Sequence, residues 1–184
     1  MNATQLLKTQ HQDVRDLFEQ IESEENEDRR LELFEELAAN LVAHDAIERQ
    51  IFYPACEKEL GMTDELGEAL VEHGLVEFAL YNTDRAEPDH FKHKLSVLKE
   101  VVEHHVKEEE KEFLPKAEKA LGKERLEQLG ATMEQKFQQA LEEDFREPLT
   151  KNLQQVLAGA IKTKPEAKPK GDAGKSRSNQ RHPH

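Results

Sequence analysis

A motif of histidine, glutamate, phenylalanine and proline occurs twice in this sequence, and its spacing constrains the fold more than any other feature. Residues 44–61 read HDAIERQIFYPACEKELG and residues 105–122 read HVKEEEKEFLPKAEKALG, identical at eight of eighteen aligned positions. Both copies contain H-x-x-x-E-x-x-x-F-x-P. Because residues four apart lie on one face of an α-helix, each histidine and its glutamate point in the same direction.

Apolar residues recur at helical spacing along most of the chain, and no segment has the alternation typical of a strand. Turn-forming residues divide the pattern. Pro54 and Pro115 are expected to interrupt two of the helices, and Gly61 and Gly122 to end them. Thr63 is a candidate N-cap. The predicted helices span about 4–23, 28–60, 64–84, 90–121, 124–145 and 149–161.

Each of the first four predicted helices places a histidine on its apolar stripe, and three of them add a glutamate one turn later. The histidines of the first and third helices are 62 residues apart, and those of the second and fourth are 61 apart. The chain therefore contains two similar helix hairpins, which predict an all-α, antiparallel up-down-up-down four-helix bundle over residues 1–122. The inward-facing polar residues are His11, His44, Glu48, His73, Glu77, His105 and Glu109.

These seven side chains predict a metal site. One buried histidine is more often a hydrogen-bonded core residue than a ligand. Three carboxylates buried beside four imidazoles, however, would be costly without added positive charge. A structural zinc site uses four ligands, often cysteines, and Cys56 is the single cysteine. Seven mixed nitrogen and oxygen ligands suit two ions.

We therefore expect two iron ions in a non-haem di-iron centre, ahead of manganese or zinc. Glu48 and Glu109 are the repeat-related pair and the expected bridging carboxylates, together with an oxo or hydroxo group. Glu77 is the ligand least constrained by the pattern. His104 lies about 100° off the stripe by helix geometry and is expected behind the ligands or on the surface. Tyr53 is expected to pack in the core, with a role as a hydrogen-bond donor as the alternative. Asp45 and Glu110 are expected to lie on charged faces.

The pattern of His11, His44-x-x-x-Glu48, His73 and His105-x-x-x-Glu109 resembles the hemerythrin-like proteins with an HHE cation-binding domain. The F-Y-P and F-L-P sequences at residues 52–54 and 113–115 are similar to that family as well. The resemblance covers roughly residues 1–122. It implies a non-haem di-iron centre in a four-helix bundle.

One position departs from the family's oxygen carriers, which have a second histidine one turn after the third-helix histidine. Here that residue is Glu77. A carboxylate ligand would favour the oxidised metal and could fill the position where a gas binds, which makes reversible oxygen carriage doubtful. If Glu77 instead lies behind the ligands, a coordination position stays open for peroxide, oxygen or nitric oxide.

The C-terminal part changes character. Residues 123–161 predict one or two additional helices. Residues 162–184 contain seven Lys or Arg, two acids, three prolines and no apolar residue larger than Ala, so they predict a disordered basic tail whose partner the sequence does not define. Residues 1–161 then carry a formal charge of −18, against −13 for the whole chain, which argues against nucleic-acid binding by the folded domain.

The remaining composition suggests a cytoplasmic location. A single cysteine fits a reducing compartment. No apolar run approaches the roughly 20 residues that span a bilayer, and the first residues have no hydrophobic signal core, so no membrane association is expected.

Three functions are compatible with these features. The first is a di-iron protein that binds and reacts with peroxide, oxygen or nitric oxide in oxidative or nitrosative stress. The second is a non-catalytic iron-binding, iron-storage or redox-sensing protein. The third is a metal-stapled bundle that presents its basic tail to a partner.

Overall fold

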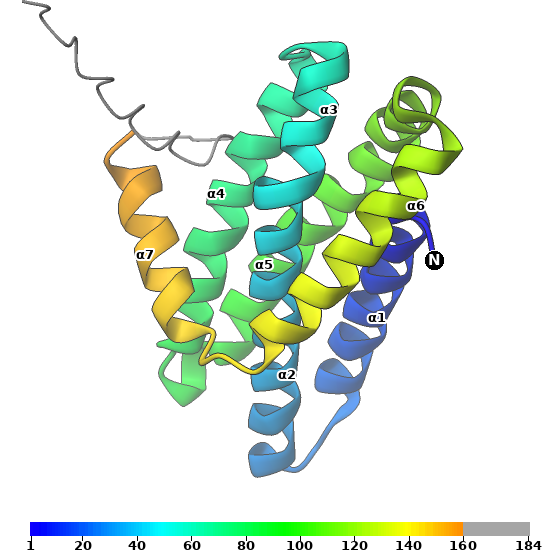
Figure 1. The fold of residues 1–184 in the computed structure, drawn as a ribbon. Coiled ribbons are helices and arrows are strands. Elements are labelled where there is room, and N and C mark those ends of the chain that lie inside the picture. The colour runs from blue at the N-terminus through cyan, green and yellow to red at the C-terminus, as the bar shows by residue number, and fades with distance from the viewer. Residues whose placement is uncertain (160–184) are drawn as a thin grey trace, which may run out of the picture.

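The computed structural model describes residues 1–159, and helices are the only regular secondary structure within them (Figure 1). Residues 160–184, which include the predicted tail, lie outside the described residues. The division into segments 1–122, 123–161 and 162–184 stays a prediction. In chain order the helices are α1 (Ala3–Ser23), α2 (Glu27–Ile47), α3 (Tyr53–Leu60), α4 (Asp64–Asp84), α5 (Pro88–Glu108), α6 (Leu114–Leu141) and α7 (Arg146–Leu157), with π-helical turns η1 (Glu48–Phe52) and η2 (Glu109–Phe113).

Polar side chains begin three of the long helices. Asn2, Asn26 and Thr63 each accept a hydrogen bond from the backbone N–H three residues later, and so satisfy a donor that the first helical turn leaves free. Pro88, in the first turn of α5, lacks an N–H that would have no partner there. Thr63 therefore caps α4 as its sequence context predicts.

The two predicted proline interruptions take a specific form, a π-helical turn immediately before each proline. The N–H of Tyr53 bonds the carbonyl of Glu48, five residues back, and the N–H of Leu114 bonds Glu109 in the same way. Each wider turn holds one extra residue and shifts the buried face. Regular α-helical spacing after His44 and Glu48 would turn Ile51 inward, but Ile51 is only half-buried, whereas Phe52 is fully buried.

The helices pack in adjacent pairs that are covered by the C-terminal segment. α1 contacts α2, and α4 contacts α5. α6 crosses α1 and α2, whereas α7 lies along α4 (Figure 1). Gly122, at φ 70°, breaks the helical geometry inside α6 at the predicted stop, and α7 begins at Arg146, three residues earlier than expected. Among the described residues, no helix is long and apolar enough to cross a membrane.

The apolar core is divided into two clusters, and the predicted polar residues lie between them. One cluster includes Leu7, Phe52 and Phe113, and the other includes Phe18 and Leu98. Along α1, His11 separates Leu7 of the first cluster from Phe18 of the second. The bundle thus has a buried polar layer between two apolar layers.

We predict that Gly130→Ala destabilises the protein, because a Cβ at Gly130 would overlap the backbone of Met1 and lie 2.8 Å from the nitrogen of Ala3. Such overpacking costs about 1–3 kcal/mol. Gly67, in α4, has nothing within 4 Å of its Cβ position, so Gly67→Ala should gain about 0.5–1 kcal/mol from helix propensity. Urea unfolding of both variants measures the difference. Equal effects at the two positions would contradict the close contact between α6 and the N-terminus.

Candidate metal centre

Four buried histidines from four helices bring their Nε2 atoms together at the middle of the bundle. His11 Nε2 lies 3.2 Å from His44 Nε2, and His73 Nε2 lies 3.2 Å from His105 Nε2. These residues are between 2% and 8% exposed. The polar layer is therefore built around two imidazole pairs, each with one histidine from a first helix and one from a second helix of a hairpin.

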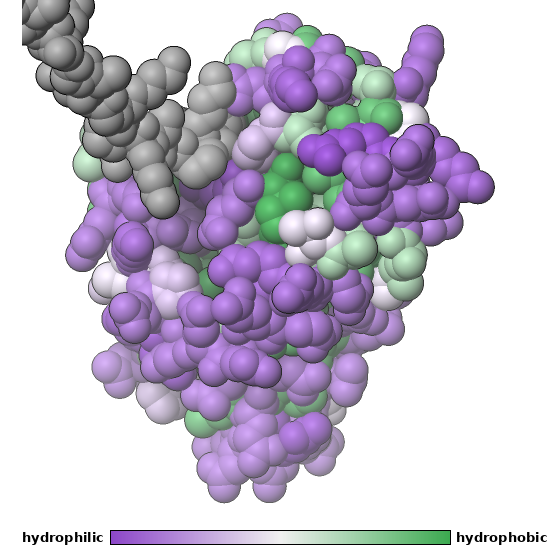
Figure 2. Space-filling model, in the orientation of Figure 1, coloured by the Kyte–Doolittle hydropathy of each residue, from purple (hydrophilic) through white to green (hydrophobic). Residues whose placement is uncertain are grey.

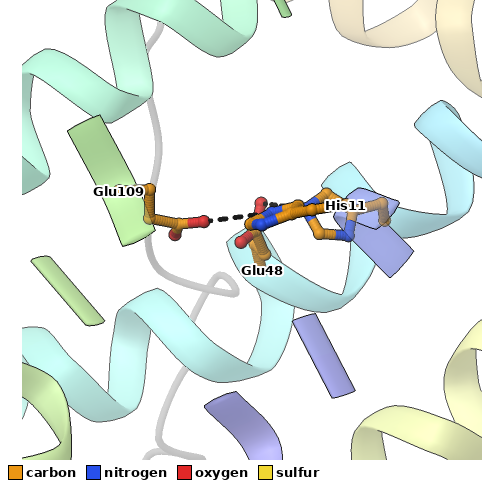
Figure 3. Close-up of side chains that lie close together, drawn as sticks. His11, Glu48 and Glu109 are labelled. Atoms are coloured by element: carbon orange, nitrogen blue, oxygen red, sulfur yellow. Dashed lines mark hydrogen bonds and ion pairs between the residues drawn. The ribbon is translucent and has the colours of Figure 1, made fainter. Parts of the chain in front are cut away.

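Two glutamates complete this layer. Glu48 Oε2 lies 3.2 Å from both His44 Nε2 and His73 Nε2, so its carboxylate reaches both imidazole pairs. Glu109 Oε2 lies 3.3 Å from His11 Nε2, and Figure 3 shows Glu109 and His11 facing each other beside Glu48. Both glutamates begin π turns, and in each copy of the motif the proline follows its glutamate by six residues.

The side chains form two groups that could each hold a cation. One consists of His11, His44, Glu48 and Glu109, and the other of Glu48, His73 and His105, with candidate ligand atoms within 4.8 Å of one another. Glu48 belongs to both groups, as a bridging carboxylate would. Glu109 belongs to the first group.

Each histidine also has a hydrogen-bonding partner behind it. The Nδ1 atoms of His11, His44, His73 and His105 lie 3.0, 2.8, 2.6 and 2.9 Å from side-chain oxygens of Glu110, Gln10, Asp45 and Glu72, respectively. A partner at Nδ1 fixes the ring and its tautomer and leaves Nε2 free to bind a metal. The sequence predicts Asp45 and Glu110 on charged faces, but both support a candidate ligand. Asp45 is only 8% exposed.

The donor set fits a metal because the layer has unused acceptors. Both oxygens of Glu48 and Oε2 of Glu109 are buried and make no hydrogen bond of regular geometry among the described residues, although imidazole nitrogens lie within 3.3 Å of Glu48 Oε2 and Glu109 Oε2. Burial alone would raise the pKa of Glu48, but His44 and His73 outweigh it and hold that pKa well below its ordinary value. Imidazole nitrogens with ionised carboxylates suit iron, and would also accept manganese or zinc.

Glu77 lies one turn from His73 and belongs to neither ligand group. Its Oε2 is 3.3 Å from Nη2 of Arg49, and Arg49 Nε donates to Asp45 at 2.6 Å. Burial and the charge of Asp45 raise the pKa of Glu77 to about 7. In this arrangement Glu77 contacts the residues that support His73.

Tyr53 combines the two roles considered for it, because it is fully buried in the core and its hydroxyl is hydrogen-bonded. Its hydroxyl donates to Glu109 Oε1 at 3.1 Å and lies 3.0 Å from His73 Nε2. Burial and the charge of Glu109 raise the Tyr53 pKa well above its usual range, so the phenol keeps its proton. The repeat indicated a polar role for this position, because Tyr53 carries a hydroxyl where the aligned residue of the second copy, Leu114, is apolar.

His104 is turned away from the centre, as expected. Its side chain is 61% exposed, and Nε2 lies 3.2 Å from Glu72 and 3.5 Å from Glu108. These three residues form an outer group with metal-ligand chemistry, but two of them are exposed.

A small apolar cavity opens beside three of the candidate ligands, His44, His73 and His105. Its volume is about 40 Å³. Such a space holds a molecule of two or three heavy atoms. Its remaining lining residues are Val14, Leu41, Val42, Asp45, Val76, Glu77, Leu80, Val102, Val106 and Asn152.

A helical bundle with a buried layer of histidines and carboxylates defines a class of metal-binding proteins, and comparison with known proteins identifies the family. The model of the hemerythrin HHE cation binding domain matches residues 2–117, so the chain belongs to this family. This confirms the resemblance inferred from the motif.

A solved structure gives the same result for the fold. A hemerythrin HHE cation binding domain-containing protein from Mycobacterium kansasii is similar, with 26% sequence identity and a TM-score of 0.68 over 89% of this chain and 99% of that one. That alignment extends beyond the family match and includes part of the C-terminal segment. No functionally curated protein matches this chain.

We predict that Glu48→Ala and Glu109→Ala lose bound metal and melt at a lower temperature than the wild type. Metal binding stabilises the folded state because its free energy adds to that of folding. His104→Ala, at an exposed position, should change neither property. Elemental analysis and thermal unfolding before and after chelation test this. Equal metal content in all variants would contradict the assignment of the layer.

We predict a specific pH dependence for the metal-free protein. Burial disfavours the charged forms of His11 and His73, but contacts with carboxylates outweigh this effect. Glu109 and Glu110 raise the pKa of His11 to about 9. Asp45 and Glu48 raise the pKa of His73 to about 10. The stabilising contribution of the two histidines is complete below the unfolded pKa of about 6.5 and is lost as the pH rises through these values.

The lowered pKa of Glu48 has the opposite consequence. Its contribution is present above the ordinary carboxylate pKa and is lost as the pH falls through the lower, folded value. Urea midpoints of chelator-treated protein should therefore decline toward alkaline and strongly acidic pH. A midpoint that stays constant from neutral pH to above 10 would contradict the ion pairs of His11 and His73. His11→Gln should reduce the alkaline decline.

Proposed function

We propose that this protein is a non-haem di-iron protein that binds and reacts with a small oxidant or gas, namely peroxide, oxygen or nitric oxide, as part of oxidative or nitrosative stress handling. The observation that carries the proposal is the apolar cavity of about 40 Å³ against His44, His73 and His105. A centre that only stored metal would have no need for an open space with largely apolar walls next to its ligands.

The supporting chemistry comes from the donor set. Bound iron would supply redox chemistry and a Lewis acid. His11, His44, His73 and His105 would hold it through Nε2, Glu48 would contribute to both metal positions, and Glu109 would be a second carboxylate. We also retain Glu109 as a bridging candidate.

Residues around the ligands would control geometry and protons. Asp45, fixed by Arg49 at 2.6 Å, holds the His73 ring in orientation. Tyr53 keeps a proton on its hydroxyl and directs it at Glu109. The valines and leucines of the cavity exclude bulk water from the neighbouring ligands.

The position of Glu77 supports reactivity. Its carboxylate lies beside Arg49 and outside both ligand groups, an arrangement that would leave a coordination position for an external molecule. We therefore favour a role for Glu77 behind the ligands over its direct binding to metal.

A specific observation favours the alternative, a non-catalytic iron-binding, iron-storage or redox-sensing protein. The hydroxyl of Tyr53 lies within 3.1 Å of both His73 and Glu109 and could occupy the space that an external ligand needs. In that case the centre would be closed, and the acidic surface would serve to attract cations.

The proposal includes the arrangement of the helices and the location of the protein. Short connections between α1 and α2 and between α4 and α5 favour an up-down-up-down bundle. The single cysteine, buried and free, favours the reducing cytoplasm.

We predict close to two iron ions per chain in untagged protein produced with iron available, and consumption of added peroxide by that protein. Elemental analysis gives the metal content, and an oxygen electrode together with peroxide absorbance gives the reaction. Glu48→Ala should lose both properties, whereas His104→Ala should retain both.

The outcomes separate the candidate functions. Two irons without reaction toward peroxide, oxygen or nitric oxide would favour the reservoir or sensor. One zinc per chain, or no metal, would overturn the di-iron proposal. Removal of residues 162–184 should leave the reaction unchanged, because only a tail-presenting scaffold would depend on them.

A further inference from the structure

The C-terminal helix α7 contributes to the candidate centre although it lies outside the residues of the family match. It is held against α4, where a Cβ on Gly74 would lie 3.0 Å from Val156. Its own residues Leu149 and Leu153 are buried. α7 is thus firmly packed, and its inward-facing polar residues have defined positions.

A large cleft separates α7 from α6. It has a volume of about 700 Å³, and its floor comes from α2 and η1. Figure 2 shows on this face a hydrophobic recess framed by hydrophilic side chains. The cleft is open to solvent, so it provides room for a small molecule to approach the bundle from outside.

The cleft and the inner cavity are neighbours. Three residues, Val42, Asp45 and Asn152, line both of them. These side chains therefore form the wall between the solvent-accessible cleft and the space beside His44, His73 and His105.

The three residues differ in how firmly they are held. Val42 is buried in the apolar core, and Asp45 is bonded at 2.6 Å to both Arg49 and His73. Asn152 is half-buried; its Nδ2 donates a long hydrogen bond of 3.3 Å to Asp45, and its side chain also interacts with Glu77. A bond of 3.3 Å is weak, so Asn152 is held less firmly than Asp45.

We propose that the cleft and the cavity form the route by which a small oxidant reaches the metal centre, and that Asn152 is the specificity-determining residue that closes it. The proposal rests on the proposed function. Displacing the Asn152 side chain opens the wall without disturbing the bonds of Asp45 to Arg49 and His73.

The two spaces account for the kind of molecule admitted. The cleft is lined by Arg49, Lys136 and Lys151 and by several side-chain amides, and can accept polar molecules. The inner cavity, at about 40 Å³, is walled by valines and leucines together with Asp45 and Glu77, so an anion would meet carboxylates as well as a desolvation cost there. Uncharged molecules of two or three heavy atoms satisfy both conditions.

A second hollow beside the centre is lined mainly by glutamates. It has a volume of about 20 Å³ beside His105 and Glu109 and is lined by Glu65, Glu68, Glu72, Glu108 and Glu112. Its carboxylates suit a cation and not an uncharged oxidant. The cleft under α7 is therefore the better entrance for the oxidant.

The test compares Asn152→Ala, Asn152→Phe and Gln155→Ala, a matched control that lines the cleft and not the cavity. Stopped-flow measurement of nitric oxide association with the iron(II)-loaded protein gives the rate. It should rise in Asn152→Ala and fall about tenfold in Asn152→Phe, which corresponds to about 1.4 kcal/mol. Gln155→Ala should match the wild type.

Two further measurements separate the possible failures. Iron content of every sample shows whether the centre itself is present, so loss of the proposed function is recognised independently. Methyl NMR under xenon pressure then reports access to Val76 and Val102 of the cavity without requiring iron. Equal association rates and equal xenon responses in the Asn152 variants and the wild type would overturn the proposed route. An effect of Gln155→Ala as large as that of Asn152→Phe would also overturn the assignment to Asn152.

Discussion

The structure depends on the burial of carboxylate charge in the middle of a small apolar core. Glu48 is fully buried, and its oxygens make no hydrogen bond of regular geometry among the described residues, although two imidazole nitrogens lie 3.2 Å from Oε2. An ionised carboxylate in such a place requires positive charge, from protonated imidazoles or from a metal. The two apolar clusters, the π turns and the partners behind each histidine all serve to hold this layer in one geometry.

Much of this arrangement could be predicted because helical periodicity is a strong signal. His11, His44, His73 and His105 lie on apolar stripes, so their burial follows from the same rule that identifies the core. Glu48 and Glu109 follow because i, i+4 spacing fixes their direction. The prolines also predicted where helical geometry would break.

The details that could not be predicted depend on shifts of one residue or on contacts between distant segments. A π turn before Pro54 moved the buried face from Ile51 to Phe52, and proline indicates a break without defining its type. Asp45 appeared to be one of many surface acids, because its partner His73 comes from another hairpin. Asn152 carried no signal, since its position depends on how α7 packs on α4.

The partners behind the histidines differ between the halves of the repeat. His11, His73 and His105 have carboxylates at Nδ1, whereas His44 has the neutral amide of Gln10. A carboxylate partner makes an imidazole a stronger electron donor than an amide does. The duplicated sequence therefore builds two unequal halves, and the two candidate metal positions are not equivalent. Two identical ions placed there would differ in reduction potential, so that one electron would have a preferred site.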